Sequence, residues 1–372
     1  MPDEAPVNRR PTLTESPPIR AVLKAQPSDF EVEEVAKIEP SGSGEHCWCW
    51  IEKRDLTTPE AARRIARALG VDPRSVGWAG LKDRHAVTRQ WLSLPATEPA
   101  RAIAVDLDGL RVLQARRHPR KLRSGALAGN RFTLLLREVD RAHVALLRTL
   151  LEELVRSGAP NYFGAQRFGR EGRNIDAARA WLLQGQRPPR NRFHRKLFVS
   201  VLQSAAFNDV VAQRIEDGTL DRVMAGDLLQ KTSSRATFRS EDPATEQARL
   251  ARWELSPTGP MFGAKMQRAL GAAGDLEARI EAAHGLGTEV YRAMGRLGEG
   301  TRRPLRVRVE GANLEPCKDG VRLSMTLPAG AYATEVLREL FKGGLVDASR
   351  PAPPTQTTEP NPHEVAPAGG GC

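Results

Sequence analysis

The chain has 372 residues, of which 40% are hydrophobic, so it is long enough for two or three domains and can bury a sizeable core. Its net charge of +11 favours a polyanionic partner, either a nucleic acid or an anionic membrane surface. Its four cysteines do not make a disulfide framework, and no apolar run is long enough to cross a membrane, so we expect a reducing, cytoplasmic setting.

Two tails and several strands are predicted along the chain. Residues 1–18 and 346–372 are rich in Pro, Ala, Thr and Gly and poor in large apolar groups, and we expect both to be disordered. Alternation of apolar and polar residues with a period of two predicts strands at 30–35, 46–54, 130–139, 304–310 and 321–327. We expect the last two to pair through a turn at residues 318–320.

Three helices are also predicted. One spans 57–70, with Thr57 and Glu60 in capping-box spacing and Gly70 at its end. The others span 141–158, which has an apolar stripe, and 333–341. Residues 160–303 are more helical and richer in Gly and Pro, which indicates a separate domain inserted there. Strands and helices mix without a regular alternation, which favours an α+β fold.

No cofactor motif is found. The stretch "HCWCW" (46–50) offers two cysteines and a histidine, but no second ligand pair follows at a suitable spacing. We therefore predict a buried strand there and no metal site. Phosphate-binding loops, dinucleotide fingerprints and nucleophile elbows do not occur either. Any catalysis is expected to use side chains alone.

Two basic runs indicate contact with nucleic acid. Residues 111–131 carry seven basic side chains and no acidic one, and residues 187–196 carry a second run. One run is usually a solvated face, but two uncompensated runs repel each other, and a phosphate backbone relieves that repulsion. The residues predicted to contact RNA phosphates are Arg116, Arg117, Arg120, Lys121, Arg123, Arg192, Arg195 and Lys196.

Two further stretches leave alternatives open. Residues 161–174 interleave Tyr162, Phe163 and Phe168 with arginines, so the rings either stack on unpaired bases or pack in a core. Asp83 is the one carboxylate between Asp72 and Glu98. Basic neighbours favour its charged form, which a carboxylate nucleophile needs, but a charged turn has the same pattern.

Three segments together resemble the TruD family of tRNA pseudouridine synthases. They are "AGLKDRHAVTRQW" (79–91), "GNRF" (129–132) and "NYFGAQRFG" (161–169). Residues 22–35, 256–263 and 327–340 are similar to further segments of the family and follow in its order. Matches between 216 and 303 are patchy.

The resemblance implies a fold and an activity. The fold is an α+β pseudouridine synthase domain with a mixed, largely antiparallel sheet, at residues 19–158 and 304–345. A TruD-specific domain is inserted at 159–303, with RNA held in the cleft between the two. The substrate is tRNA and the usual target is uridine 13. Isomerisation of a uridine gains and loses no atom, so no cofactor is required. We expect a monomer without membrane contact.

The resemblance also implies residue roles. Asp83 matches the catalytic aspartate and Phe132 the aromatic residue that packs on the target base. Lys24 matches a basic residue beside the active site. The other residues expected to bind the substrate are Lys82, Arg84, His85, Asn130, Gln166 and Arg167.

Two other functions stay open at this point. A non-catalytic RNA-binding or RNA-folding protein would use the same basic surface. A nucleoside- or glycoside-cleaving enzyme would use Asp83 and release free base, although glycosidases generally need a second, paired carboxylate.

Overall fold

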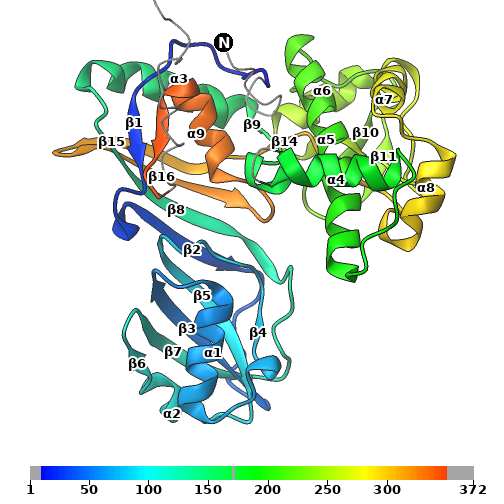
Figure 1. Cartoon of the computed structure of the whole chain (residues 1–372). Helices are drawn as coiled ribbons and strands as arrows, with labels where there is room; N and C mark the ends of the chain where they lie inside the picture. The colour runs from blue at the N-terminus through cyan, green and yellow to red at the C-terminus, as the bar shows by residue number, and fades with distance from the viewer. Residues whose placement is uncertain (1–9, 170–171, 350–372) are drawn as a thin grey trace, which may run out of the picture.

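A large mixed β-sheet forms the left part of the molecule in the computed structural model, which describes residues 10–169 and 172–349 (Figure 1). In the described residues its strand order is β15-β16-β8-β2-β5-β3-β7-β6, with β1, β17 and β4 attached beside this path. Only the pairings β2–β5 and β1–β17 are parallel in that part of the chain. The sheet is therefore mixed and largely antiparallel, as predicted. Its strands are β1 (Ala21–Leu23), β2 (Phe30–Ala36), β3 (His46–Arg54), β4 (Gly77–Trp78), β5 (Val87–Pro95), β6 (Asp106–Leu107), β7 (Leu110–His118), β8 (Leu127–Arg137), β15 (Glu310–Cys317), β16 (Gly320–Pro328) and β17 (Leu345–Asp347).

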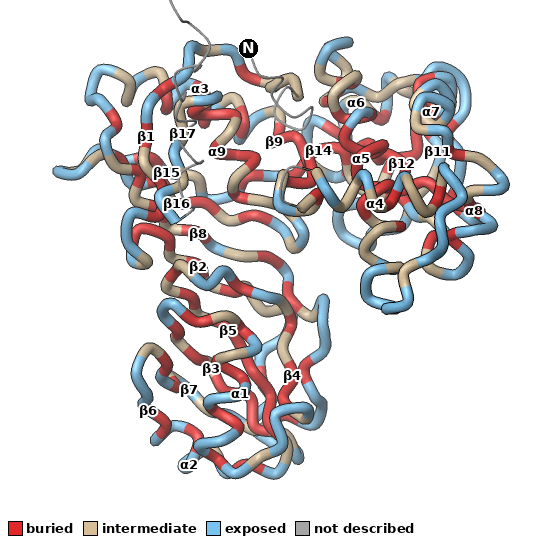
Figure 2. The backbone as a smooth tube through the Cα atoms, viewed as in Figure 1, coloured by how far each residue is buried: buried red, intermediate tan, exposed pale blue. Residues whose placement is uncertain are grey.

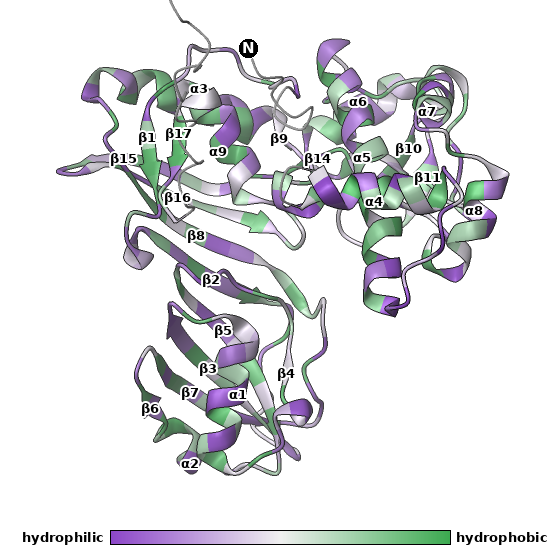
Figure 3. Ribbon diagram, in the orientation of Figure 1, coloured by the Kyte–Doolittle hydropathy of each residue, from purple (hydrophilic) through white to green (hydrophobic). Residues whose placement is uncertain are grey.

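Amphipathic helices pack on this sheet. They are α1 (Thr58–Leu69), α2 (Pro99–Ile103), α3 (Val144–Ser157) and α9 (Ala333–Phe341). The apolar side of α1 packs with buried residues of β3, β5 and β7, whereas α3 and α9 pack with those of β1, β8 and β16. Green and purple stretches alternate along α1, as expected for a helix with one apolar side (Figure 3). The helices on the sheet therefore pack in two separate regions, and a third buried cluster gathers Trp48 of β3, Trp91 of β5 and Leu127 of β8.

The predicted ends of α1 are confirmed. Thr57 and Glu60 form the reciprocal capping box, and Gly70 ends the helix in the left-handed conformation with φ of 72°. The helix predicted from residue 141 begins at Val144, because residues 141–143 form a 3-10 turn. Further 3-10 turns lie at Pro27–Asp29, Pro73–Ser75, Ala165–Phe168, Gly295–Leu297 and Lys342–Gly344.

A second lobe lies to the right of the sheet (Figure 1). Its antiparallel sheet has the strand order β11-β10-β12-β13. Helix α5 is largely buried within this lobe, and Figure 2 shows red stretches along it. Strands β9 (Ala159–Pro160) and β14 (Arg306–Val307) pair where the chain enters and leaves the lobe. The elements are α4 (Arg173–Leu182), α5 (Arg192–Glu216), β10 (Leu228–Lys231), β11 (Thr237–Arg239), α6 (Pro243–Ala251), β12 (Leu255–Met261), α7 (Gly271–Ala283), α8 (Thr288–Met294) and β13 (Thr301–Pro304).

The predicted turn at 318–320 is confirmed, but the predicted pairing of 304–310 with 321–327 is wrong except at Glu310, which lies opposite Thr326. Strand β16 pairs with β15 and β8, whereas Arg306 and Val307 pair with β9. The hairpin closes with Cys317 opposite Gly320, which leaves a two-residue turn. A turn this short requires the strand immediately before it as partner, although Gly, Asn and Pro weaken the strand pattern there.

The expected disorder of both tails is wrong for their inner residues. The Thr14 hydroxyl donates to the Glu339 carbonyl oxygen of α9 at 2.7 Å, and the Thr14 N–H donates to the Glu339 carboxylate at 3.1 Å. Val346 pairs with Val22 in the sheet. Such contacts with distant partners are not visible in local composition. Residues 1–9 and 350–372 lie outside the described residues. Within residues 10–169 and 172–349, no helix combines the length and apolarity that spanning a bilayer requires.

Candidate active site

The loop that carries Asp83 is fixed by its neighbour Lys82. The Lys82 ammonium lies 2.8 Å from Oε2 of Glu34 on β2, and both side chains are almost fully buried. The Lys82 backbone N–H donates to the Thr58 hydroxyl at the start of α1. Burial raises the pKa of Glu34, and the Lys82 charge opposes this rise. With Lys82 directed inward, Asp83 stays 55% exposed at the surface of the loop.

Two lysines from distant parts of the chain bond to Asp83. The Lys24 ammonium lies 2.7 Å from Oδ2 of the Asp83 side chain. The Lys53 ammonium, at the end of β3, donates to the Asp83 backbone carbonyl at 2.7 Å. Lys53 is fully buried, and this burial lowers its pKa to about 8, although the nearby Asp83 charge acts in the opposite direction. Carboxylate and backbone are thus fixed separately, while one side of the carboxylate stays open to solvent.

Phe132 is connected to this centre through Phe30. The Lys24 ammonium lies 4.1 Å from the centroid of the Phe30 ring, and Phe30 meets Phe132 edge to face at 6.2 Å. Lys24 itself adopts a left-handed backbone with φ of 58°, which is uncommon for a residue other than Gly. Phe132 is only 7% exposed, so most of its ring packs in the core. Its stacking on a base stays a prediction.

Asn130 lies beside the buried Lys82–Glu34 pair. In the register of the sheet, Asn130 of β8 is opposite Glu34 of β2. Its Oδ1 atom is buried and has no hydrogen-bond partner among the described residues, and the same holds for the Thr88 hydroxyl on β5. Leaving a buried polar atom unpaired costs about 1–3 kcal/mol, so each of these two acceptors is available to a bound water or ligand.

Arg84 and His85 follow Asp83 but bond elsewhere. The Arg84 Nε donates to the Asp55 carbonyl at 3.3 Å, and His85 Nδ1 lies 3.1 Å from the Asp55 carboxylate. Both side chains therefore contact the loop after β3, and no bond joins either of them to the Asp83 carboxylate in the described part of the chain.

Among the described residues, no hydrogen bond or ion pair joins Gln166 or Arg167 to Asp83. Both lie in the 3-10 turn Ala165–Phe168 of the second lobe, where Arg167 bonds to Ser200 and Ser204 of α5. The open question about the rings nearby is answered by their burial. Tyr162, Phe163 and Phe168 are 1–6% exposed, so the core interpretation is confirmed.

The predicted phosphate-binding residues form two groups on different parts of the molecule. Arg116, Arg117, Arg120, Lys121 and Arg123 lie on β7 and the loop after it, whereas Arg192, Arg195 and Lys196 lie in the first turns of α5. Arg117 forms an ion pair with Glu98. The other seven residues form no ion pair in the described part of the chain. Six of them are exposed, and Arg195 is partly buried.

Three residues were not predicted for this site: Glu34, Lys53 and Leu81. Lys53 lies on the same face of β3 as the buried Cys49 and Ile51. A lysine at a position that the alternation assigns to the buried face could have indicated a site residue. Glu34 lies on the buried face of β2. Leu81 is 71% exposed two residues before Asp83, and an apolar side chain this exposed beside a carboxylate suits contact with a ligand.

Comparisons with known proteins agree on one family. The sequence model described as "tRNA pseudouridine synthase D (TruD)" matches residues 6–187 and 191–340. A tRNA pseudouridine synthase D from Anaeromyxobacter dehalogenans is 46% identical over 327 residues, which cover 86% of this chain and 92% of the relative. One from Pseudomonas putida is 45% identical over 324 residues, with 86% and 91% covered.

A solved structure supports the fold. The crystal structure of a tRNA pseudouridine synthase D from Methanosarcina mazei aligns with a TM-score of 0.73 at 23% identity. The alignment covers 92% of this chain and 98% of the other. The α+β fold with its second lobe is therefore shared across distant sequences.

Proposed function

Because this chain belongs to the TruD family of tRNA pseudouridine synthases, it is an isomerase that acts on tRNA, and we propose that Asp83 is its nucleophile and uridine 13 its target. The observation that carries the proposal is the half-exposed carboxylate of Asp83, held at 2.7 Å by Lys24. A charged turn without a function needs no such fixed partner from a distant part of the chain.

The reaction breaks the N1–C1′ bond of the uridine, turns the uracil and joins C5 to C1′. The proton on C5 leaves and N1 gains one, so the atoms balance without a co-reactant. The Asp83 carboxylate can act at the ribose or at the base. At the ribose it attacks C1′ or assists deprotonation, as carboxylates do near oxocarbenium-like centres. At the base it adds to C6 of the ring. The exposed side of the carboxylate suits either role.

The residues beside Asp83 are proposed to receive the base. Extruding a nucleotide from its stack costs a few kcal/mol. The exposed Leu81 supplies apolar surface at the entrance, and the free acceptor of Asn130 suits an N–H of the uracil. Phe132 offers a ring edge on the same face, where aromatic contact recovers about 1–3 kcal/mol.

We also propose how the whole chain is arranged and used. Residues 19–158 and 304–345 form the catalytic domain, and residues 159–303 form an inserted domain. The basic group on β7 and the one on α5 hold tRNA phosphates from two sides. Such contacts fix the position of the tRNA on the enzyme but do not distinguish its bases. The enzyme is proposed to act as a cytoplasmic monomer.

Tritium release tests the nucleophile and the target. Unmodified tRNA labelled with tritium at C5 of its uridines is incubated with wild-type protein, Asp83→Asn and the control Asp72→Asn, which alters a similarly exposed carboxylate 11 positions away. We expect release by wild type and by Asp72→Asn and none by Asp83→Asn. We expect no release from tRNA in which uridine 13 is replaced by cytidine.

Each alternative outcome has a clear meaning. Tight tRNA binding without tritium release by wild type would favour the RNA-binding or RNA-folding protein. Free uracil in the products would favour a base-cleaving enzyme. Equal release by Asp83→Asn would remove Asp83 from the chemistry.

A further inference from the structure

A cavity of about 600 Å³ lies between the two sheets. Val35, Gly129 and Leu327 line it from the large sheet, and Trp253, Arg303 and Arg306 line it from the second lobe and the segment that returns from it. Its volume falls in the usual range of ligand sites, about 300–1,000 Å³. It is distinct from the Asp83 loop, none of whose residues lines it.

Two arginines in this cavity, Arg303 and Arg306, form no ion pair within the described ranges of the chain. The Asp221 charge acts on Arg306 only from beyond ion-pair distance. Arg303 donates to the carbonyl oxygens of Asn161 and Gly330 and to the Asn161 side chain. Arg306, which is 3% exposed, donates to the carbonyl oxygens of Ser157 and Leu250. Because neutral acceptors do not cancel a charge, the cavity retains a strong preference for an anion.

Aromatic rings and free donors complete the site. The Arg303 guanidinium lies 4.2 Å from the centroid of Phe163, and that of Arg306 lies 4.2 Å from the centroid of Trp253. The Nε atom of each arginine is buried without a hydrogen-bond partner among the described residues. Burial lowers the pKa of both guanidiniums to about 10, so both stay charged at neutral pH.

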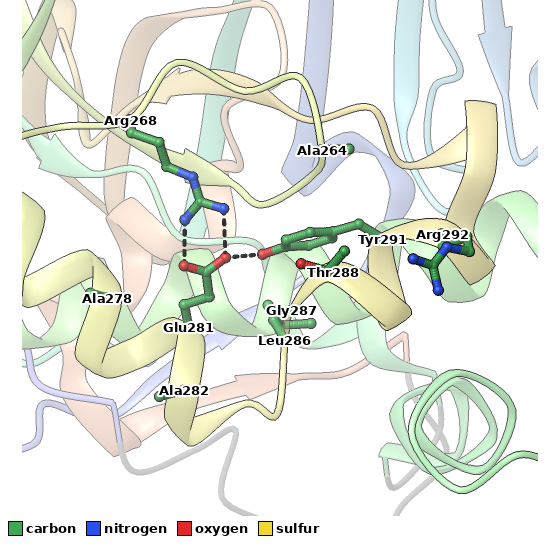
Figure 4. Close-up of a pocket in the computed structure, with 10 residues that line it drawn as sticks. All are labelled: Ala264, Arg268, Ala278, Glu281, Ala282, Leu286, Gly287, Thr288, Tyr291 and Arg292. Atoms are coloured by element: carbon green, nitrogen blue, oxygen red, sulfur yellow. Dashed lines mark hydrogen bonds and ion pairs between the residues drawn. The ribbon is translucent and has the colours of Figure 1, made fainter.

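Other arginines of the same lobe show the contrast. The buried Arg302, next to Arg303 in the chain, is paired with Glu277 at 2.6 Å, and the buried Arg214 is paired with Asp227 at 3.0 Å. In another cavity of the lobe, of about 640 Å³, the Glu281 carboxylate binds the exposed Arg268 and the Tyr291 hydroxyl (Figure 4). These arginines have a carboxylate within ion-pair distance, whereas Arg303 and Arg306 have none among the described residues.

We propose that this cavity binds a second nucleotide of the tRNA, with its phosphate at Arg303 and Arg306 and its base against the half-buried Trp253. Aromatic rings next to guanidiniums are the combination that binds unpaired nucleotides. This inference rests on the proposed function, because the ligand is taken to be part of the same RNA that presents uridine to Asp83.

The position of the cavity favours an RNA chain over a free nucleotide. Leu327, which lines the cavity, is opposite Asn130 in the sheet, and Asn130 is opposite Glu34, which binds Lys82 beside Asp83. Because directly paired residues point to the same face of a sheet, the two sites adjoin there, so one RNA strand can occupy both. Arg235, an exposed residue from the turn between β10 and β11, adds a further charge at the cavity wall.

Phosphate ethylation interference tests the site on the full-length protein. tRNA carrying about one ethylated phosphate per molecule is separated into bound and free fractions with wild type, Arg303→Gln and the control Arg296→Gln. Arg296 is exposed and outside the cavity lining, and its substitution removes the same charge. We expect ethylation of one or two phosphates to block wild type and the control but not Arg303→Gln. The Kd of Arg303→Gln should rise about tenfold, and its salt slope should fall by about 1.

The outcomes separate this inference from the proposed function. The same interference pattern in wild type and Arg303→Gln would overturn the inference. The inference would also be overturned if uridine 5′-monophosphate bound tightly through Arg303 while the ethylation interference pattern of tRNA stayed unchanged. The cavity would then bind a free nucleotide. If Arg303→Gln fails to fold, Arg235→Gln replaces it, because Arg235 is exposed. This variant should weaken interference at the same phosphates, and an interference pattern equal to that of wild type would overturn the inference. Tritium release by wild type, measured in parallel, reports on the proposed function alone.

Discussion

The Lys24 ammonium lies 2.7 Å from the Asp83 carboxylate, although 59 positions separate the two residues in the chain. Asp83 is 55% exposed, so solvent screens the pair and its direct contribution to stability is small. Lys24 is itself held against the Phe30 ring. The contact is therefore better suited to orienting the carboxylate than to stabilising the fold.

Lys24→Met should lower kcat by about 10- to 100-fold and change the Kd for tRNA by less than about threefold, because an unrestrained carboxylate loses its alignment with the reacting atoms. Single-turnover tritium release and filter binding measure the two constants. Lys37→Met, which alters an exposed lysine bonded to the Gly125 carbonyl, is the matched control. A loss of binding equal to the loss of turnover would show that Lys24 holds RNA instead.

Leu81→Ala should leave the free energy of unfolding within about 0.5 kcal/mol of wild type, because the side chain is already 71% exposed. Its kcat/KM should fall about tenfold, since apolar contact with the extruded nucleotide is lost. Ile103→Ala, at a 46% exposed position on α2, should change neither quantity. An unchanged kcat/KM for Leu81→Ala would mean that the nucleotide approaches Asp83 from another side.

The lowered pKa of Lys53 predicts that the free energy of unfolding depends on pH. In the unfolded chain a lysine keeps its proton up to about pH 10.4, whereas burial lowers the pKa of native Lys53 to about 8. Between these values the unfolded state binds more protons, so the stability contributed by Lys53 rises with pH. Relative to Lys53→Met, wild type should gain about 2 kcal/mol between about pH 7.5 and pH 9.5.

Urea unfolding of wild type and Lys53→Met at both pH values measures this gain. Comparing the two proteins cancels the other groups that titrate in the same window. Lys318→Met, at an exposed position, should follow wild type at both pH values. A constant difference between wild type and Lys53→Met would show that Lys53 keeps its proton in the folded protein up to the higher pH.

Local patterns were sufficient for the elements that depend on neighbouring residues. Helix α1 was predicted from Thr57, Glu60 and Gly70 because capping uses side chains and backbone within one turn. Strand β3 was predicted correctly from the alternation of side chains along residues 46–54. The hairpin partner of β16 was misassigned because its true partner contains Gly, Asn and Pro, and its pairing is determined by the turn.

The site depended on contacts that local patterns do not encode. Family resemblance identified Lys24 and Asp83, but their contact comes from the packing of β1, β2 and the loop before β5. Lys53 was missed because its burial depends on α1 and on the Asp83 loop covering the end of β3. Arg167 of the "NYFGAQRFG" segment was expected to bind the substrate; its bonds to α5 were not foreseen, because they arise where the adjacent rings fill the core of the second lobe.

The basic group on β7 and the loop after it should determine part of the salt dependence of tRNA binding. Arg120 and Arg123 are exposed and form no ion pair among the described residues, whereas Arg117 is paired with Glu98. Each arginine that neutralises a phosphate contributes about 1 to the slope of log K against log salt. Arg120→Gln/Arg123→Gln should therefore lower the slope by about 2, and Arg117→Gln by less than 1, when Kd is measured from low to moderate salt. Equal slopes for the double variant and wild type would place the RNA backbone elsewhere on the surface and leave this group as a solvated face.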